Sequence, residues 1–181
     1  MRLKSKMSLT AIALSGLVLV GCVGAPKTPD FKPLNASLAD AKWDGKTIPS
    51  NEVCHKFNSR AGNAPKIAIN NLNATSTKIE LSFNDESAGP EFNFGGHGVI
   101  EYQLPNEVKN SITVPSVPGQ IKELPENFSI KRNFTSRAWD TGYGYLPPCS
   151  GGKGNLYTVT IKAYNNKGEV TGDTKLTLGR Y

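Results

Sequence analysis

The sequence is poor in the residues that most often carry chemistry. Its 181 residues include three cysteines, two histidines, two tryptophans and two methionines. It contains no Gly-x-Ser-x-Gly nucleophile elbow, no zinc-ligand spacing and no Walker phosphate-binding loop. It also lacks the run of lysines and arginines that marks a nucleic-acid-binding surface. These absences give no support to a metal site, a cofactor or a nucleic-acid partner, and little to a hydrolase.

The N-terminal segment is typical of a bacterial lipoprotein signal. Arg2, Lys4 and Lys6 precede an apolar run over residues 7–20, which is short for a membrane span. Leu-Val-Gly-Cys ends the run, and small residues before a cysteine resemble a lipobox. We therefore expect a signal peptide over residues 1–21 and lipidation of Cys22; an ordinary signal peptide with an unrelated cysteine is the alternative.

Cleavage before Cys22 would remove three positive charges, so the formal net charge would fall from +6 to +3. A charge of this size would not hold the chain to a membrane, whereas acyl chains would. Val23 follows Cys22 at the position where an aspartate would favour the inner membrane. We therefore expect a cell-envelope protein anchored in the outer membrane, with the face it occupies left open.

Two cysteines remain in the predicted mature chain, Cys54 and Cys149. In an oxidising compartment such a pair favours a disulfide over a metal site or a nucleophile. His55 adjoins Cys54, but neighbours on an extended chain point to opposite faces, so a catalytic Cys-His pair is not expected. The sequence therefore predicts a bridge between Cys54 and Cys149.

The rest of the chain predicts an all-β domain over residues 41–181, with helix limited to a turn or two. Residues 22–40 hold three prolines and no apolar period, so we expect a flexible tether. An acidic, glycine-containing loop is predicted over residues 84–95, and a hairpin turn over 165–168. Short strands separated by turns favour a β-sandwich. The strands are expected at 66–72, 77–83, 99–104, 111–114, 120–124, 156–164 and 173–178.

A segment rich in glycine and proline, residues 142–153, leads into the predicted strand at 156–164. Glycine lets the backbone approach a ligand or another segment closely, and proline stiffens the turn, so such loops often form the rim of a pocket. A long surface turn held by Cys149 is the alternative.

The order of these motifs resembles the phosphatidylethanolamine-binding protein family, in its bacterial Raf-kinase-inhibitor-like branch. The resemblance covers roughly residues 40–181. It rests on the following elements: Ile48-Pro49, Cys54, Gly62-Asn63-Ala64-Pro65, residues 84–90, His97, Leu104-Pro105, Leu124-Pro125, Arg132-Asn133-Phe134, the loop at 142–153 and the ending Leu178-Gly179-Arg180-Tyr181.

The resemblance implies a Greek-key β-sandwich with a pocket for a small anion, such as a phosphate or a phospholipid head group. Carried over residue by residue, it places Asp85 on the acidic loop, His97 at the pocket histidine, and Tyr143, Pro147 and Pro148 at the rim. It also matches Cys54 and Cys149 to two cysteines common in that branch. A histidine and the N–H groups of a glycine-rich turn are suitable donors to an anion.

The chain departs from the family pattern at several points. Asn155-Leu156-Tyr157 stands where the family has His-Arg-Tyr, so Asn155 replaces a histidine at the pocket. Asp85-Glu86-Ser87 replaces Asp-Pro-Asp, and no room remains for a C-terminal helix. Counting back from Pro105 puts Gly98, not His97, at the pocket position, so only a one-residue bulge would turn His97 inward. Otherwise His97 would be an exposed turn histidine, and Asp85 and Glu86 would be solvated loop carboxylates.

Three functions remain open at this point. The first is a non-enzymatic binding protein for a small anion, a phospholipid head group or a protein partner. The second is an inhibitor or interaction protein of the protease or kinase type, with a degenerate pocket. The third, a hydrolase, has no motif to support it.

Overall fold

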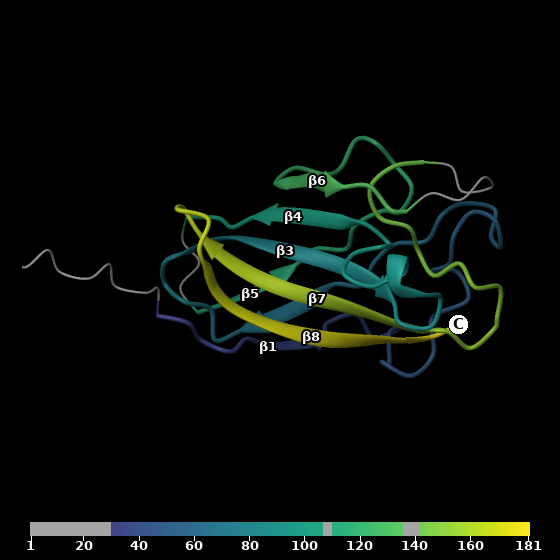
Figure 1. The fold of residues 1–181 in the computed structure, drawn as a ribbon, viewed down its shortest axis with the longest axis horizontal. Coiled ribbons are helices and arrows are strands. Elements are labelled where there is room, and N and C mark those ends of the chain that lie inside the picture. Colours follow the sequence, from purple (N-terminus) through teal and green to yellow (C-terminus); the bar gives the residue numbers. More distant parts are fainter. Residues whose placement is uncertain (1–29, 107–109, 136–141) are drawn as a thin grey trace, which may run out of the picture.

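The computed structural model describes residues 30–106, 110–135 and 142–181 (Figure 1). These ranges form two antiparallel sheets and one short 3-10 turn, η1 (Pro90–Phe92). The predicted signal peptide and Cys22 lie outside the described residues. Within the described ranges, no helix has the length and apolar character needed to cross a bilayer.

The larger sheet has Greek-key connectivity. Its strands are arranged in the order β6–β4–β3–β7–β8. Three strands that follow one another in this sheet, β3, β4 and β6, lie side by side, and β7 then returns to the free side of β3. The bounds are β3 (Ser76–Asp85), β4 (Val99–Gln103), β6 (Phe128–Arg132), β7 (Leu156–Asn165) and β8 (Val170–Arg180).

The smaller sheet lies behind the larger one in Figure 1 and has the order β1–β2–β5. Its strands are β1 (Asn35–Leu38), β2 (Ile67–Asn70) and β5 (Ser111–Val114). Ile67 and Ile69 of β2 are buried against the larger sheet. The prediction of an all-β sandwich is therefore confirmed.

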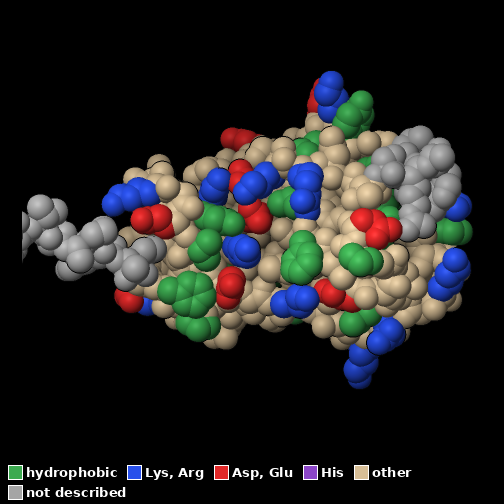
Figure 2. Space-filling model, in the orientation of Figure 1, with side chains coloured by type: hydrophobic (Ala, Val, Ile, Leu, Met, Phe, Trp, Pro, Cys, Tyr) green, Lys and Arg blue, Asp and Glu red, His purple; other side chains and the backbone are tan. Residues whose placement is uncertain are grey.

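Alternation along the central strands explains why the sheets pack. In β3, Ile79, Leu81 and Phe83 are buried in the core, while Lys78 and Glu80 belong to the opposite face. That outer face carries mixed lysine, arginine and acidic side chains, as Figure 2 shows. Burial of the alternating apolar set between the sheets is the main stabilising term for such a fold.

The tether predicted over residues 22–40 is wrong for its described part. Residues 35–38 form β1, which pairs with β2. Before it, the N–H groups of Lys32 and Leu34 donate to carbonyls of β8, and the Leu34 side chain is buried. A strand at the edge of a sheet can pair through its backbone without an apolar period. The polar sequence of β1 therefore gave no sign of a strand.

Two other details differ from the expected strands. Residues 120–124 do not form a strand; Gln120 has a left-handed φ of 55°, and its N–H donates to the Tyr145 carbonyl. The missing strand is instead β6, in which Phe128 and Ile130 alternate with polar residues. The closing hairpin is confirmed, since Gly168 N–H donates to the Asn165 carbonyl between β7 and β8.

Candidate functional site

One end of the sandwich encloses a cavity of about 480 Å³. It lies where β3 ends and β7 begins, because Asp85 is in register with Tyr157 across these two strands. The segment after Cys54 and the loop over residues 146–155 form its remaining walls. The polar and aromatic lining includes Lys56, Asp85, Phe92, His97, Lys153 and Asn155.

A β-bulge turns His97 into the cavity. Phe83 of β3 accepts the His97 N–H on its carbonyl but donates its own N–H to the Gly98 carbonyl. His97 and Gly98 therefore both lie opposite the single residue Phe83, which is the definition of a β-bulge. Gly98 has a φ of 105°, and an added Cβ would overlap the Gly144 carbonyl. The one-residue bulge that His97 needed is present, and its side chain is 3% exposed rather than on a surface turn.

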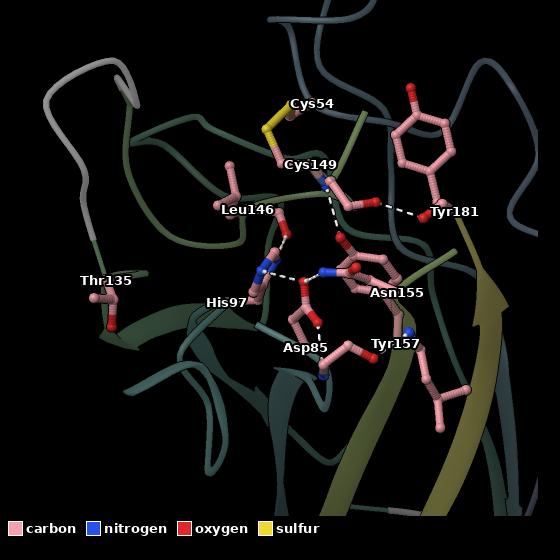
Figure 3. A network of polar contacts seen from close by, with 12 residues as sticks. Cys54, Asp85, His97, Thr135, Leu146, Cys149, Asn155, Tyr157 and Tyr181 are labelled. Carbon is pink, nitrogen blue, oxygen red and sulfur yellow. Dashed lines mark hydrogen bonds and ion pairs between the residues drawn. A yellow bond between two sulfur atoms is a disulfide. The ribbon is translucent and has the colours of Figure 1, made fainter. Parts of the chain in front are cut away.

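The hydrogen bonds of His97 define its protonation state. Its Nδ1 lies 2.9 Å from the Leu146 carbonyl oxygen, and because a carbonyl can only accept, Nδ1 carries a proton (Figure 3). Burial lowers the pKa of His97, while the Leu146 carbonyl and the Asp85 carboxylate oppose that shift. The neutral ring therefore presents an unprotonated Nε2 towards Asp85, 4.0 Å from Oδ2.

Asp85 is a buried carboxylate, 3% exposed. Its Oδ1 accepts the Ser87 N–H at 2.9 Å, and its Oδ2 accepts Asn155 Nδ2 at 2.8 Å. These two donors fix the Asp85 carboxylate at the end of β3, where it lines the cavity (Figure 3). Asp85 is therefore a fixed part of the wall, not a solvated loop residue.

Tyr157 forms the layer behind Asp85 and His97. Its ring meets His97 edge-on at 5.3 Å between centroids, and its hydroxyl accepts the Cys149 N–H at 3.1 Å. Burial raises the pKa of Tyr157, and the Asp85 carboxylate raises it further, so the phenol stays neutral. The ring and hydroxyl thereby connect the pair to the loop that carries Cys149.

The predicted disulfide is confirmed. Cys54 and Cys149 are bonded, with their Cα atoms 5.3 Å apart. Cys54 is fully buried, and Cys149 lines the cavity. Next to the bond, the Cys54 N–H donates to the Pro148 carbonyl. The bridge thus holds the segment with Lys56 and Phe57 against the opposite wall.

The rim of the cavity is basic and aromatic. Lys56 and Lys153 both line it and are exposed. The Lys56 Nζ lies 5.3 Å from the centroid of the Phe57 ring, which in turn meets Tyr181 edge-on. The cavity therefore has two positive groups at its opening and one negative group at its floor.

The structure brings together Asp85, His97 and Asn155, but not the three other predicted pocket residues. Tyr143 is 49% exposed and lines a separate hollow with Asn133. Pro147 and Pro148 are buried and do not line the cavity. Pro147 packs against Gly119, where an added Cβ would overlap its ring. The two prolines therefore shape the loop from behind, and placing them at the rim was wrong.

Other residues of the site were not found from the sequence. Ser87 follows Asp85 at the spacing of an Asx turn, which is a usable local signal. Leu146 contributes only its carbonyl, and Lys56 and Lys153 come from loops that meet only in the fold. Leu146 and Lys153 lie in the segment 142–153 that was predicted as a pocket rim, but no sequence pattern singles them out within it, and none marks Lys56.

The described lining of the cavity contains a carboxylate and an imidazole but no activated nucleophile. The Ser87 hydroxyl accepts the Leu156 N–H, and the Ser150 hydroxyl donates to the Tyr181 backbone oxygen. Neither is hydrogen-bonded to His97, which a serine nucleophile would require. Among the described residues no cluster of His, Cys, Asp or Glu could hold a metal ion. The arrangement is suited to holding a polar molecule.

Fold and site together define an all-β sandwich with a buried Asp-His pair in an end cavity. No protein-family model matches the sequence, and no curated protein matches it. Among solved structures, the chain is similar to a crystal structure from Chlamydia trachomatis described as a phosphatidylethanolamine-binding protein homolog. The similarity has 16% identity and a TM-score of 0.48, and it covers 82% of this chain and 97% of the other. That description names the family that the sequence motifs resemble.

Proposed function

We propose that this protein is a lipid-anchored binding protein of the bacterial envelope that holds a small anion or a phospholipid head group in the end cavity. The observation that carries the proposal is the cavity itself. Its volume of about 480 Å³ falls within the range of small-ligand pockets, about 300 to 1,000 Å³. A fixed polar floor and a lysine-bearing rim are the features that orient a charged ligand.

The rim supports an anionic part of the ligand. Lys56 and Lys153 lie on opposite loops that the disulfide holds near one another. Because both lysines are exposed, solvent screens their attraction for a phosphate, and each ion pair would contribute about 1 kcal/mol or less. The surrounding Phe57 and Phe92 supply apolar surface for the rest of the molecule.

The proposed role is binding without catalysis. Asp85 Oδ1 and Oδ2 already accept hydrogen bonds from Ser87 and Asn155, and the nearby serines have other partners. Catalysis would need a nucleophile or a water-activating group aligned with His97.

A protein-interaction role is the second candidate, and Phe94 favours it. This side chain is 86% exposed at a left-handed backbone position, φ 54°. It borders a hollow of about 370 Å³ on the outer face of the larger sheet, beside Arg132 and Lys162. An exposed aromatic among cationic side chains is a common anchor at protein interfaces.

Thermal unfolding with phosphate, acetate and phosphoethanolamine tests the main proposal. A ligand at a hundred times its Kd adds about 2.7 kcal/mol to the free energy of unfolding, which raises Tm by several degrees. The double variant Lys56→Gln/Lys153→Gln should lose this shift. Lys167→Gln, in the exposed turn at the far end of β7, is the matched control and should keep it.

The absence of a shift with all three compounds would contradict the binding proposal and favour the surface around Phe94. The anchor is tested separately by expressing Cys22→Ser. We expect that variant to leave the membrane fraction, whereas unchanged fractionation would exclude lipidation at this residue.

A further inference from the structure

The exposed ring of Phe94 is held in place by a tightly packed turn. It has a left-handed φ of 54°, which is strained for a bulky side chain. The N–H of Gly95 donates to Oδ1 of the buried Asn84 at 2.6 Å, and the Arg132 guanidinium donates to the Phe94 carbonyl. A Cβ added at Gly95 would overlap the side chains of Val99 and Arg132, so the turn lies close on the larger sheet. The ring is therefore fixed outward by its surroundings.

A bulge in β6 places two consecutive cations beside this ring. Arg132 and Ile130 pair with neighbouring residues of β4, so Lys131 between them is an extra residue in the ladder. On a regular strand, consecutive side chains point to opposite faces. Here Lys131 and Arg132 both line the hollow of about 370 Å³ that Phe94 borders, and Lys162 of β7 adds a third cation. The bulge thus concentrates positive charge around the exposed ring.

Two of the three cations have no acidic partner among the described residues. Glu80, the carboxylate in the lining of the hollow, forms an ion pair with Lys131. Arg132 and Lys162 form no ion pair with a described carboxylate, although Asp173 is in register with Lys162 across β7 and β8. The hollow therefore has two positive charges that no described carboxylate neutralises, next to an exposed aromatic ring.

We infer that the surface formed by Phe94, Arg132 and Lys162 docks an acidic segment of a partner protein. Carboxylates of the segment lie at the two cations, and an apolar side chain packs on the ring. Aromatic and arginine side chains are the residues enriched at interface anchors, and complementary charge selects the partner. The inference rests on the protein-interaction role given above as the second candidate, names the chemistry of the partner and does not depend on the end cavity.

Peptide selection followed by binding measurements tests the inference. A random peptide display library is selected on the wild-type protein and counter-selected on Phe94→Ala. We expect the enriched peptides to carry Asp or Glu beside a large apolar residue. One such peptide, labelled with a fluorophore, is then titrated by anisotropy at low and at high salt, together with a version that has Asn and Gln in place of Asp and Glu. The amide version should bind more weakly at low salt, and the difference should shrink at high salt.

The variants separate the ring from the charge. Phe94→Ala should weaken the acidic peptide about tenfold or more, as loss of an interface anchor does. Its thermal unfolding should match wild type, because the ring is 86% exposed. Lys162→Gln should weaken the peptide up to about fivefold, which corresponds to an exposed ion pair. Lys167→Gln removes the same charge from the exposed turn at the far end of β7 and should leave binding unchanged.

Enrichment of neutral or basic peptides that need Phe94 would overturn the acidic assignment and leave the interaction role standing. A dimer in sedimentation that Phe94→Ala abolishes would overturn it by assigning the surface to a second copy of the chain. Binding to phosphatidylglycerol vesicles that needs Phe94 would overturn it by assigning the surface to a membrane. If no peptide distinguishes wild type from Phe94→Ala, the inference and the second candidate both fail, whereas the end cavity is judged by the anion titrations alone.

Discussion

The disulfide gives the prediction whose size follows most directly from the structure. Cys54 and Cys149 are 95 residues apart in the chain, so the bond closes more than half of the protein into a loop. In the chain-entropy treatment, a loop of this length removes unfolded-state entropy worth about 4.7 kcal/mol at 25 °C. Measured losses on removing native disulfides run from about 2 to 5 kcal/mol.

We expect Cys54→Ala/Cys149→Ala to lower the free energy of unfolding by about 3 to 5 kcal/mol, a large share of the stability of a typical domain. Urea titration followed by tryptophan fluorescence measures this, since Trp43 is buried in the core. The m value should rise, because the unfolded chain without the bond exposes more surface. Reduced wild-type protein should match the double variant. A loss below about 1 kcal/mol with an unchanged m value would refute the reasoning.

Two further predictions concern the bulge and its histidine. The folded-state pKa of His97 is below its ordinary value of 6.5, so the unfolded state binds more protons at this residue. The free energy of unfolding should therefore fall as pH drops below about 6.5, by up to 1.4 kcal/mol per pH unit. His97→Asn should flatten the pH dependence of the free energy of unfolding above pH 4.5. Glu86, whose pKa is lowered by Lys175, contributes to that pH dependence only below its ordinary pKa of 4.5. An unchanged slope in urea titrations of the variant would show that His97 is not the group responsible. Gly98→Ala should cost at least about 2 kcal/mol, because it combines a left-handed φ with backbone overlap, and wild-type-like Tm would contradict this.

The sequence was sufficient for the fold class because the alternation in β3 and β7 is long and regular. Ile79, Leu81 and Phe83 occupy every second position of the strand predicted at 77–83, and all three face the core. The pairing of Cys54 with Cys149 followed from cysteine counting, and the structure has this bond. Strand β1 was not predicted because it pairs with β2 through backbone hydrogen bonds, and every sequence has the backbone groups that make them.

The candidate site was only partly accessible to sequence reasoning. Whether His97 points inward depends on one extra residue in the ladder, and counting along the chain cannot decide that. The resemblance supplied Asp85 and Asn155, which do line the cavity, but it misplaced Tyr143, whose loop turns towards another hollow. The rim lysines come from separate loops, so only the tertiary structure brings them together.

The position of β3 has a consequence for how the protein would stand on a membrane. Asp30 accepts a hydrogen bond from Asn73, just before β3 starts, whereas Asp85 closes the same strand at the cavity. At about 3.3 Å per residue, the ten residues of β3 put these ends roughly 30 Å apart. Residues 22–29 can span at most about 28 Å. With the proposed lipid on Cys22, the anchored segment would join the domain at the end of β3 opposite the cavity.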